Sequence, residues 1–302
     1  MSSVVAPVDG SDNASRAIAY LGNLARRNRP IGPGSAQRFL SIQKLMWKLL
    51  KAQRFAPTAA TGLLPNGMSA SKLSCIICAH NEAPRITEVL AVAAAHPLLD
   101  EVIVVDDGST DGTASIVRSF PSVRLLSCPQ NRGKSRAFAD GVRAARYDYI
   151  MHLDADLKYL TAANITDLAE PVLSRRYGMS ISVRKNSLAA YRWMGLDFVS
   201  GERVIPKRIV ASCLAEIDKL PRFGIEAFIN ARVIDERLGI AIITLENVMN
   251  TRKTEKIGWC RGTLADYRTT RDVLRVISPL EMIRQNYRML LLARATRAPD
   301  LL

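Results

Sequence analysis

Short apolar runs alternate with helical segments in the middle of this sequence, and the alternation limits the folds that the chain can adopt. Four runs rich in apolar and β-branched residues predict strands, at 73–79, 101–105, 123–128 and 147–153. Strands that alternate with helices form βαβ units, whose parallel strands are joined by right-handed crossovers. The sequence therefore predicts an α/β fold with a mostly parallel sheet, which binds ligands at the carboxyl ends of its strands.

The 302 residues suffice for one large domain with extensions. We expect a basic extension with an amphipathic helix and a linker at 1–71, a catalytic domain at 72–250, and a helical extension at 251–302. Beyond residue 157 the pattern predicts further strands near 178–183 and 239–245, and helices near 162–175, 206–216 and 224–238. The last extension contains a capping box with proline at the first helical position, Ser278-Pro279-Leu280-Glu281.

The net charge of +14 is concentrated at the two ends of the chain. Residues 1–72 carry a net charge of +8 and residues 261–302 carry +4, which leaves +2 for the middle. Basic flanks suit an anionic surface, either membrane or nucleic acid. A non-catalytic nucleic-acid-binding protein is thus one alternative, but only 6% of the residues are aromatic, too few to interleave stacking side chains with the charges. No nucleic-acid partner is expected.

Residues 36–55 combine positive charge with apolar residues at helical spacing. This segment predicts either a helix on an anionic membrane surface or a helix packed on the catalytic domain. No apolar run reaches the roughly 18–20 residues that span a bilayer. The N-terminus lacks a signal-peptide pattern. We therefore expect a cytoplasmic protein, with peripheral contact to the inner face of the membrane as a further hypothesis.

Polar side chains follow the first two predicted strands at the point where each strand ends. Carboxylates, hydroxyls and the histidine ring at this edge could contact the base or ribose of a nucleotide. The alternative is a pair of turns whose polar side chains cap the next helices. The candidate nucleotide-sugar-binding residues are His80, Glu82, Asp106, Asp107 and Ser109.

A basic turn, Asn131-Arg132-Gly133-Lys134-Ser135, opens the helix after the third strand. Exposed backbone N–H groups at a helix start, together with basic side chains, predict a phosphate site that includes Lys134. The alternative is a basic helix start, which the helix dipole disfavours slightly.

Two aspartates, Asp154 and Asp156, follow the fourth strand. In an extended segment, residues i and i+2 project to one side, so the two carboxylates lie together at the edge of the sheet. Carboxylates that lie so close repel each other unless a cation separates them. Hard oxygen ligands favour Mg²⁺ or Mn²⁺, which also bridges substrate phosphates. The pair predicts a metal-bound diphosphate site.

These motifs, AHNE (79–82), VVDDGSTDGT (104–113), NRGKSRA (131–137) and HLDADL (152–157), occur in the order that is typical of family 2 glycosyltransferases of the GT-A fold. The chain resembles this family over roughly 72–250, and its DADL motif is most similar to the branch that glycosylates polyprenyl phosphates, including dolichyl-phosphate mannose and glucose synthases. The resemblance implies a metal-dependent hexosyltransferase that uses a UDP- or GDP-sugar. It places Glu82 and Asp107 near the nucleoside, Lys134 near the base or phosphate, and Asp154 and Asp156 on the diphosphate and metal.

The chain departs from this family at two points. Lys158 stands where the polyprenyl-phosphate branch often has a metal-ligating glutamine, and a charged lysine cannot bind a metal. Lys158 could contact the diphosphate directly. Some relatives also use a late histidine as a ligand, whereas the last histidine of this chain is His152, which we expect to be a packed neighbour of the aspartates.

Two residues are candidates for the acceptor side and for catalysis. Arg203 lies in a segment similar to the family's SG-x-R, and it could bind an anionic acceptor bidentately. Glu226 opens a predicted helix and could act as general base for a hydroxyl acceptor. A phosphate acceptor needs no base, which would leave Glu226 a positioning role. We expect an inverting glycosyltransferase with a lipid-linked or phosphorylated acceptor at the membrane surface, or alternatively a small soluble anionic acceptor.

Deletion of residues 1–55 is expected to release the protein from anionic vesicles, because it removes most of the N-terminal positive charge together with the amphipathic segment. Vesicle co-sedimentation of the full chain and of the truncated chain measures the effect, with neutral vesicles as the control. Equal binding of both chains to anionic vesicles would remove the anchoring role and favour a helix packed on the catalytic domain.

Overall fold

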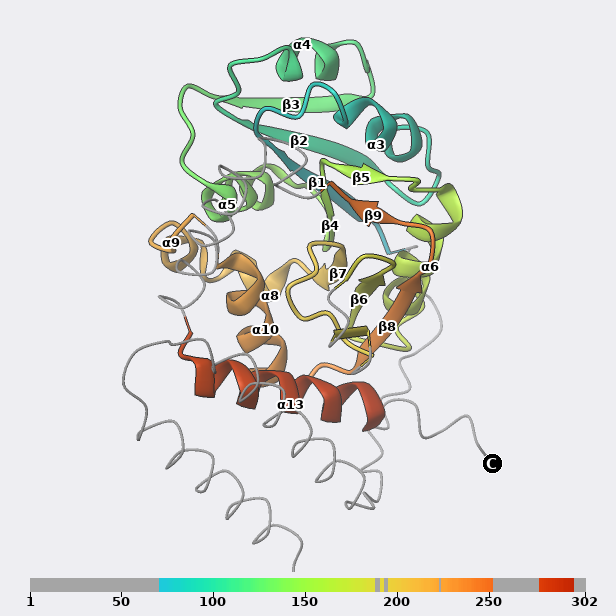
Figure 1. The fold of residues 1–302 in the computed structure, drawn as a ribbon, viewed down its shortest axis with the longest axis vertical. Helices are drawn as coiled ribbons and strands as arrows, with labels where there is room; N and C mark the ends of the chain where they lie inside the picture. The colour runs from blue at the N-terminus through green and yellow to red at the C-terminus, as the bar shows by residue number, and fades with distance from the viewer. Residues whose placement is uncertain (1–70, 188–190, 193–194, 223, 252–276, 296–302) are drawn as a thin grey trace, which may run out of the picture.

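A computed structural model describes residues 71–187, 191–192, 195–222, 224–251 and 277–295 (Figure 1). The segment 36–55, expected to be an amphipathic helix, lies outside the described residues, as does all of the expected linker but residue 71. In the described part of the chain, no helix is long and apolar enough to cross a membrane.

A seven-stranded sheet forms the centre of the described structure, in the order β3-β2-β1-β4-β7-β6-β8. Strands β1 to β4 are parallel to one another, and β6 is parallel to β8. Only β7 runs antiparallel, between β4 and β6. The mostly parallel α/β sheet expected from the sequence is confirmed. Its strands are β1 (Leu73–Ala79), β2 (Glu101–Asp107), β3 (Val123–Cys128), β4 (Tyr149–Asp154), β6 (Met179–Arg184), β7 (Arg203–Pro206) and β8 (Ile240–Leu245).

Helices cover both faces of this sheet, because strands β1 and β2 are apolar on both sides. Ile76 of β1 belongs to one apolar core, whereas its neighbour Ile77 belongs to the other. The first core includes residues of α5 (Lys134–Ala144), α8 (Arg208–Ala211), α10 (Ile225–Asp235) and α13 (Pro279–Ala295). The second core includes residues of α3 (Ile86–Ala93), α4 (Thr113–Arg118) and α6 (Ala162–Leu173).

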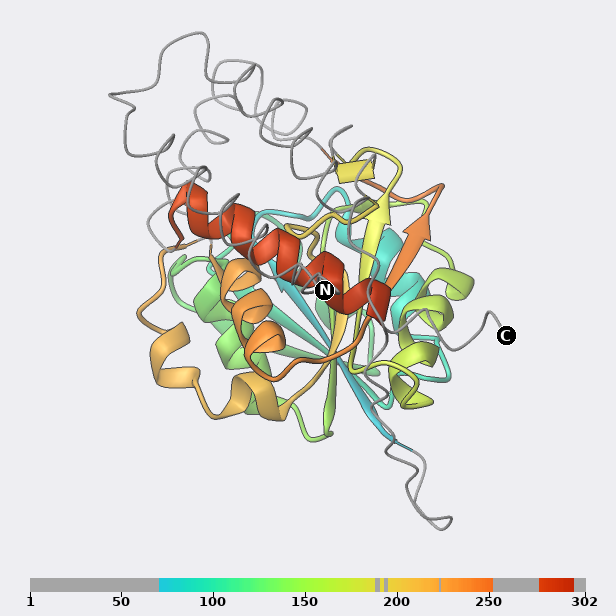
Figure 2. The ribbon, with the colours of Figure 1, turned by 90° about the horizontal axis from the view of Figure 1, so that it is seen from below.

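Helix α13 packs against α10 and β8, and its residues Met289 and Leu290 are buried in the first core (Figure 2). Ser278 caps the start of this helix, since the backbone N–H of Glu281 donates to Ser278 Oγ at 3.2 Å, which is one of the two bonds of the expected capping box. The described part of the C-terminal extension therefore completes the core of the catalytic domain instead of standing apart from it.

The structure differs from the expected elements after residue 200. The helix predicted near 206–216 is two short helices, α8 and α9 (Leu214–Ile217), and the strand β7 immediately before them was not expected. Four residues are too few to show a periodicity, and Pro206, which ends β7, has no N–H for a further ladder bond. A second small sheet pairs β5 (Leu157–Lys158) with β9 (Met249–Asn250).

Candidate active site

The carboxyl ends of β1, β2, β4 and β6 and the first turns of α5 and α10 meet on one edge of the main sheet (Figure 1). The loops after β1 and β2 are tied to each other by hydrogen bonds. His80 Nδ1 lies 2.9 Å from the carbonyl oxygen of Asp107, and the N–H of Asn81 donates to Ser109 Oγ at 2.9 Å. The N–H of Thr110 donates to Asn81 Oδ1 at 2.8 Å. The ring of His80 is exposed above these loops.

The two aspartates of the second motif point into the protein. Asp107 Oδ1 accepts from the N–H of Arg132 at 2.8 Å, and its Oδ2 accepts from the N–H of Gly133 at 2.7 Å. Asp106 accepts from the N–H of Ser109 at 3.1 Å. Asp106 and Asp107 are only 4% and 3% exposed. Their hydrogen bonds to backbone N–H groups hold the loops in shape, which fits the alternative interpretation of this motif as a turn.

The predicted phosphate cradle before α5 needs correction for the same reason. The backbone N–H groups of Arg132 and Gly133 bind Asp107, and the N–H of Ser135 donates to the carbonyl of Arg222 at 3.2 Å. These three N–H groups are therefore engaged within the protein. The side chain of Lys134 is the group of this turn that reaches Asp154 at the sheet edge.

Glu82 holds the start of α3. Its backbone N–H donates to Thr113 Oγ1 at 2.9 Å, and its carboxylate accepts from Arg85 Nε at 2.5 Å. The side chain is buried beside the loops of β1 and β2. This position borders the expected nucleoside end of the site.

Lys134 joins two acidic residues from distant parts of the sequence. Its Nζ donates to Asp154 Oδ1 and to Glu226 Oε1, in both cases at 2.7 Å. Burial alone would lower the pKa of Lys134, but the two carboxylates raise it above its usual value. Burial alone would raise the pKa of Glu226, but Lys134 and Arg203 hold it below the usual value. Glu226 is therefore an ionised carboxylate at neutral pH.

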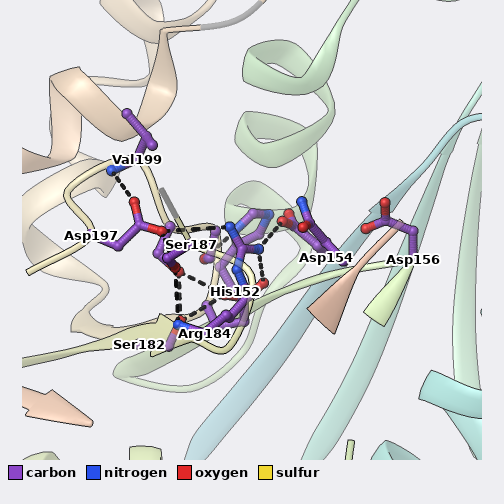
Figure 3. A network of polar contacts seen from close by, with 12 residues as sticks. His152, Asp154, Asp156, Ser182, Arg184, Ser187, Asp197 and Val199 are labelled. Atoms are coloured by element: carbon purple, nitrogen blue, oxygen red, sulfur yellow. Dashed lines mark hydrogen bonds and ion pairs between the residues drawn. The ribbon is translucent and has the colours of Figure 1, made fainter. Parts of the chain in front are cut away.

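Asp154 is bound by cations on both of its oxygens (Figure 3). Arg184 Nη1 lies 3.4 Å from Asp154 Oδ2, opposite the oxygen that Lys134 binds. Burial would raise the pKa of Asp154, but Lys134, His152 and Arg184 lower it far below its usual value. His152 is buried with Nδ1 2.7 Å from the carbonyl of Gly201, and burial lowers its pKa to about 4. It is a packed neighbour of the site, as expected.

Arg184, the last residue of β6, is a residue of this site that was not predicted from the sequence. Its guanidinium contacts Glu202 at 2.9 Å and Asp197 at 3.8 Å in addition to Asp154, and its side chain is only 8% exposed. The signal was the one that revealed the other motifs, namely a polar residue at the carboxyl end of an apolar strand.

Arg203 does not face an acceptor. Its side chain is 0% exposed, with Nη1 donating to Asn230 Oδ1 at 3.1 Å and Nε donating to the carbonyl of Ser200 at 3.2 Å. Asn230 in turn donates to the carbonyl of Phe198 at 2.9 Å. The observed burial does not fit the bidentate acceptor contact expected for Arg203, and its charge instead supports the 197–203 loop and Glu226.

Asp156 lies on the far side of Asp154 from Arg184 (Figure 3) and is 8% exposed. Its backbone carbonyl accepts from the N–H of Thr251 at 3.3 Å. Lys158, two residues further on, is half-buried in β5. Among the described residues, no three His, Cys, Asp or Glu side chains cluster as ready metal ligands. Any metal here would need oxygen ligands from a substrate or from water.

The mostly parallel sheet, with its acidic residues at the carboxyl edge, defines a GT-A α/β fold. Residues 74–212 match the model of the family described as glycosyl transferase family 2. We therefore identify this segment as a domain of that family, which confirms the resemblance seen in the motifs.

Curated relatives share only part of their length with this chain. Poly-beta-1,6-N-acetyl-D-glucosamine synthase of Staphylococcus epidermidis is 33% identical over 88 residues, which cover 28% of this chain and 21% of the relative. A dolichyl-phosphate beta-glucosyltransferase of Trichomonas vaginalis is 37% identical over 94 residues, which cover 27% of this chain and 28% of the relative. The chain thus spans a quarter or so of the length of these relatives.

Solved structures extend the likeness beyond the matched segment. Glucosyl-3-phosphoglycerate synthase from Mycobacterium tuberculosis, in complex with Mn²⁺, UDP and glucosyl-3-phosphoglycerate, superposes with a TM-score of 0.55 at 23% identity, covering 74% of this chain and 87% of that chain. The same enzyme with Mg²⁺ and UDP gives a TM-score of 0.54 at 23% identity, covering 70% and 80%. At this identity the likeness establishes the fold.

The substitution Gly201→Ala is expected to abolish nucleotide-sugar binding, because an added Cβ would lie 2.6 Å from Asp154 Oδ2 and closer still to Oδ1. Asp154 must then leave Lys134 and Arg184. Titration calorimetry with UDP-glucose and GDP-mannose measures the loss. Gly112→Ala is the control, since its Cβ would meet only Ala83 Cβ at 3.9 Å. Normal binding by the Gly201→Ala variant would show that the position of Asp154 is unimportant.

Proposed function

We propose that the protein transfers a sugar from a nucleotide-diphosphate sugar to an acceptor that carries a phosphate or carboxylate group. The observation that carries this proposal is the contact of Lys134 with both Asp154 and Glu226. In this contact Lys134 is the cation for the donor diphosphate, Asp154 is the carboxylate at the donor end, and Glu226 is an ionised acid. All three lie at the carboxyl edge of a family 2 domain. The likeness to an enzyme solved with UDP-glucose and phosphoglyceric acid supports both substrate classes.

At the nucleoside end, we assign the base and ribose to the joined loops after β1 and β2. The exposed ring of His80 and the half-buried Ser109 are the side chains available there. Glu82, Asp106 and Asp107 hold the loops in shape through their hydrogen bonds. This arrangement orients the nucleotide so that its diphosphate reaches Lys134, with Lys158 as a further candidate contact.

Asp154 and Asp156 would hold a divalent cation together with oxygen atoms of the diphosphate and of water. Asp154 is already shared between Lys134 and Arg184, so its capacity for a metal is reduced. Mg²⁺ typically binds one or two carboxylates together with waters and substrate phosphates, which suits the small number of acidic groups here. Complexes of a structural neighbour with Mn²⁺ and with Mg²⁺ support either ion. When bound, the cation neutralises charge on the departing diphosphate as a Lewis acid.

In the transfer step, an acceptor oxygen displaces the nucleotide in one step, and the family resemblance supports inversion. The ionised Glu226 takes the proton when the acceptor is a hydroxyl group. Lys134 and Arg184 stabilise the negative charge that develops on the diphosphate. Arg203 contributes without contacting the substrates. Its charge favours the ionised form of Glu226, and its hydrogen bond to the carbonyl of Ser200 holds the 197–203 loop.

A lipid-linked phosphate and a small soluble anion are both acceptors of the proposed class. The dolichyl-phosphate relative supports the first, and the phosphoglycerate complexes support the second. The basic flanks of the sequence favour an acceptor at the inner membrane surface, with the protein attached there peripherally.

The substitution Asp156→Ala is expected to lower transfer by about a hundredfold or more, because it removes a carboxylate that would hold the divalent cation at the leaving diphosphate. A panel of UDP-, GDP-, dTDP- and CDP-sugars, each with and without Mn²⁺, first identifies the donor by thermal shift. Product formation with that donor is then compared between wild type and variant. Full activity of the variant, or a wild type that binds no nucleotide sugar, would contradict the proposal.

The substitution Glu226→Gln separates the acceptor classes. For a hydroxyl acceptor the rate constant should fall by about 10²- to 10⁴-fold, the usual contribution of a general base. A phosphate acceptor is already a nucleophile, and its transfer should change by less than about tenfold. Rates with a polyprenyl phosphate and with phosphoglycerate, measured on the same two proteins, give the comparison. Unchanged rates for every acceptor would exclude Glu226 as a base.

A further inference from the structure

Arg184 lies among three carboxylates at unequal distances (Figure 3). Its Nη1 is 2.9 Å from Glu202 Oε1 but 3.4 Å from Asp154 Oδ2, and its Nη2 is 3.8 Å from Asp197 Oδ2. Charge-assisted hydrogen bonds between a cationic nitrogen and a carboxylate are normally about 2.7–2.9 Å long. Only the bond to Glu202 has this length, so Glu202 determines where the guanidinium lies.

Glu202 is itself fixed in place. Its side chain is 0% exposed, and Ser182 Oγ and Ser200 Oγ each donate to its Oε2 at 2.7 Å. The neighbouring Gly201 packs against Asp154, and the other neighbour, Arg203, is buried in its own hydrogen bonds. Glu202 therefore cannot follow Arg184 if the guanidinium moves toward the donor end of the site.

The 3.4 Å contact between Arg184 Nη1 and Asp154 Oδ2 matters because Asp154 belongs to the proposed donor site. Lys134 donates to Asp154 Oδ1 at 2.7 Å, whereas Arg184 is 3.4 Å from Oδ2, so Oδ2 is the less tightly held of the two oxygens. If Arg184 closed to normal hydrogen-bond length, each oxygen would be held at short range by a cation of the protein. A ribose hydroxyl or a metal-bound water would then have to displace a buried guanidinium.

We propose that Glu202 is a positioning residue of the donor site, which holds Arg184 back from Asp154 and so keeps Asp154 Oδ2 available to the nucleotide sugar. The inference rests on the donor site proposed above. It assigns a function to a residue that touches neither substrate. Burial and Asp154 raise the pKa of Glu202, and the contact with Arg184 and the two serine hydroxyls favour its ionised form, on which the function depends.

The substitutions Glu202→Gln and Glu202→Asp separate charge from shape. Glutamine keeps the size and hydrogen-bonding reach but loses the charge, and Arg184 then moves onto Asp154. Aspartate keeps the charge but leaves a small cavity. We expect Glu202→Gln to weaken the binding of UDP and GDP by about tenfold, the size of an ordinary coupling between neighbouring charges, and Glu202→Asp to weaken it by less. The melting temperature should show the reverse order, with Glu202→Asp the lower.

Titration calorimetry with UDP and with GDP, in Mn²⁺, measures the affinities, and thermal unfolding checks the fold. Glu170→Gln is the matched control, because it removes one acid from the exposed pair with Arg176. Glutamine leaves Arg184 with two carboxylates, so no unpaired buried charge results. Should that variant still not fold, Ser182→Ala, which loosens Glu202, is expected to weaken binding by about two- to threefold.

Two results would overturn the inference. In the first, the Gln variant, or Ser182→Ala in its place, binds both nucleotides as tightly as wild type. In the second, affinity follows side-chain size, with aspartate weaker than glutamine, as a purely structural role requires. A wild-type protein that binds neither UDP nor GDP would instead contradict the proposed function, so the two failures are distinguishable.

Discussion

One ammonium group connects the two halves of the candidate active site. Lys134 stands at the start of α5, and its two partners come from the end of β4 and from the first turn of α10. Two carboxylates that lie this close together at a strand edge would repel each other without a cation between them. The shared lysine removes that repulsion and keeps Asp154 and Glu226 ionised. The positions of donor-end and acceptor-end groups are thus coupled through a single flexible side chain.

The 197–203 loop also supports this centre, through the close approach of Gly201 and through the side chain of Arg203. Gly201 allows the 197–203 loop to lie directly on the Asp154 carboxylate, where no side chain would fit. Arg203 holds the same loop through its hydrogen bonds to Ser200 and Asn230. The buried guanidinium of Arg203 is satisfied by these hydrogen bonds to neutral oxygen atoms. Asn230 is in turn within hydrogen-bond distance of Gln285 on α13. The C-terminal helix therefore contributes to the rigidity of the site without reaching it.

The sequence predicted that the motifs after β1, β2 and β4 and before α5 lie at one edge of the sheet, but it did not predict the surroundings of Arg184 and Arg203. The motifs around Asp107, Lys134 and Asp154 each follow a local apolar run, so strand periodicity and the rule of carboxyl ends were sufficient to place them together. The roles of Arg184 and Arg203 depend on β7, a four-residue strand that pairs antiparallel with β4 some 50 positions earlier. No local sequence pattern predicts that pairing or the burial of the side chains that results from it. The same limit applies to Asp107, whose backbone partners, Arg132 and Gly133, lie on another loop.

The antiparallel strand β7 also affects the order in which the site can form during synthesis. A nascent chain that has reached residue 156 contains every donor motif, and β1 to β4 can already pair in parallel. Its fourth strand still exposes an open edge, and Asp154 has neither Arg184 nor Gly201 beside it. Long-range pairing of this kind is slow to form, and unpaired strand edges are prone to aggregation. Insertion of β7 between β4 and β6 therefore closes the open edge of β4 and accompanies the arrival of Gly201 and Arg184 at Asp154, whereas Glu226 joins the site later, with α10.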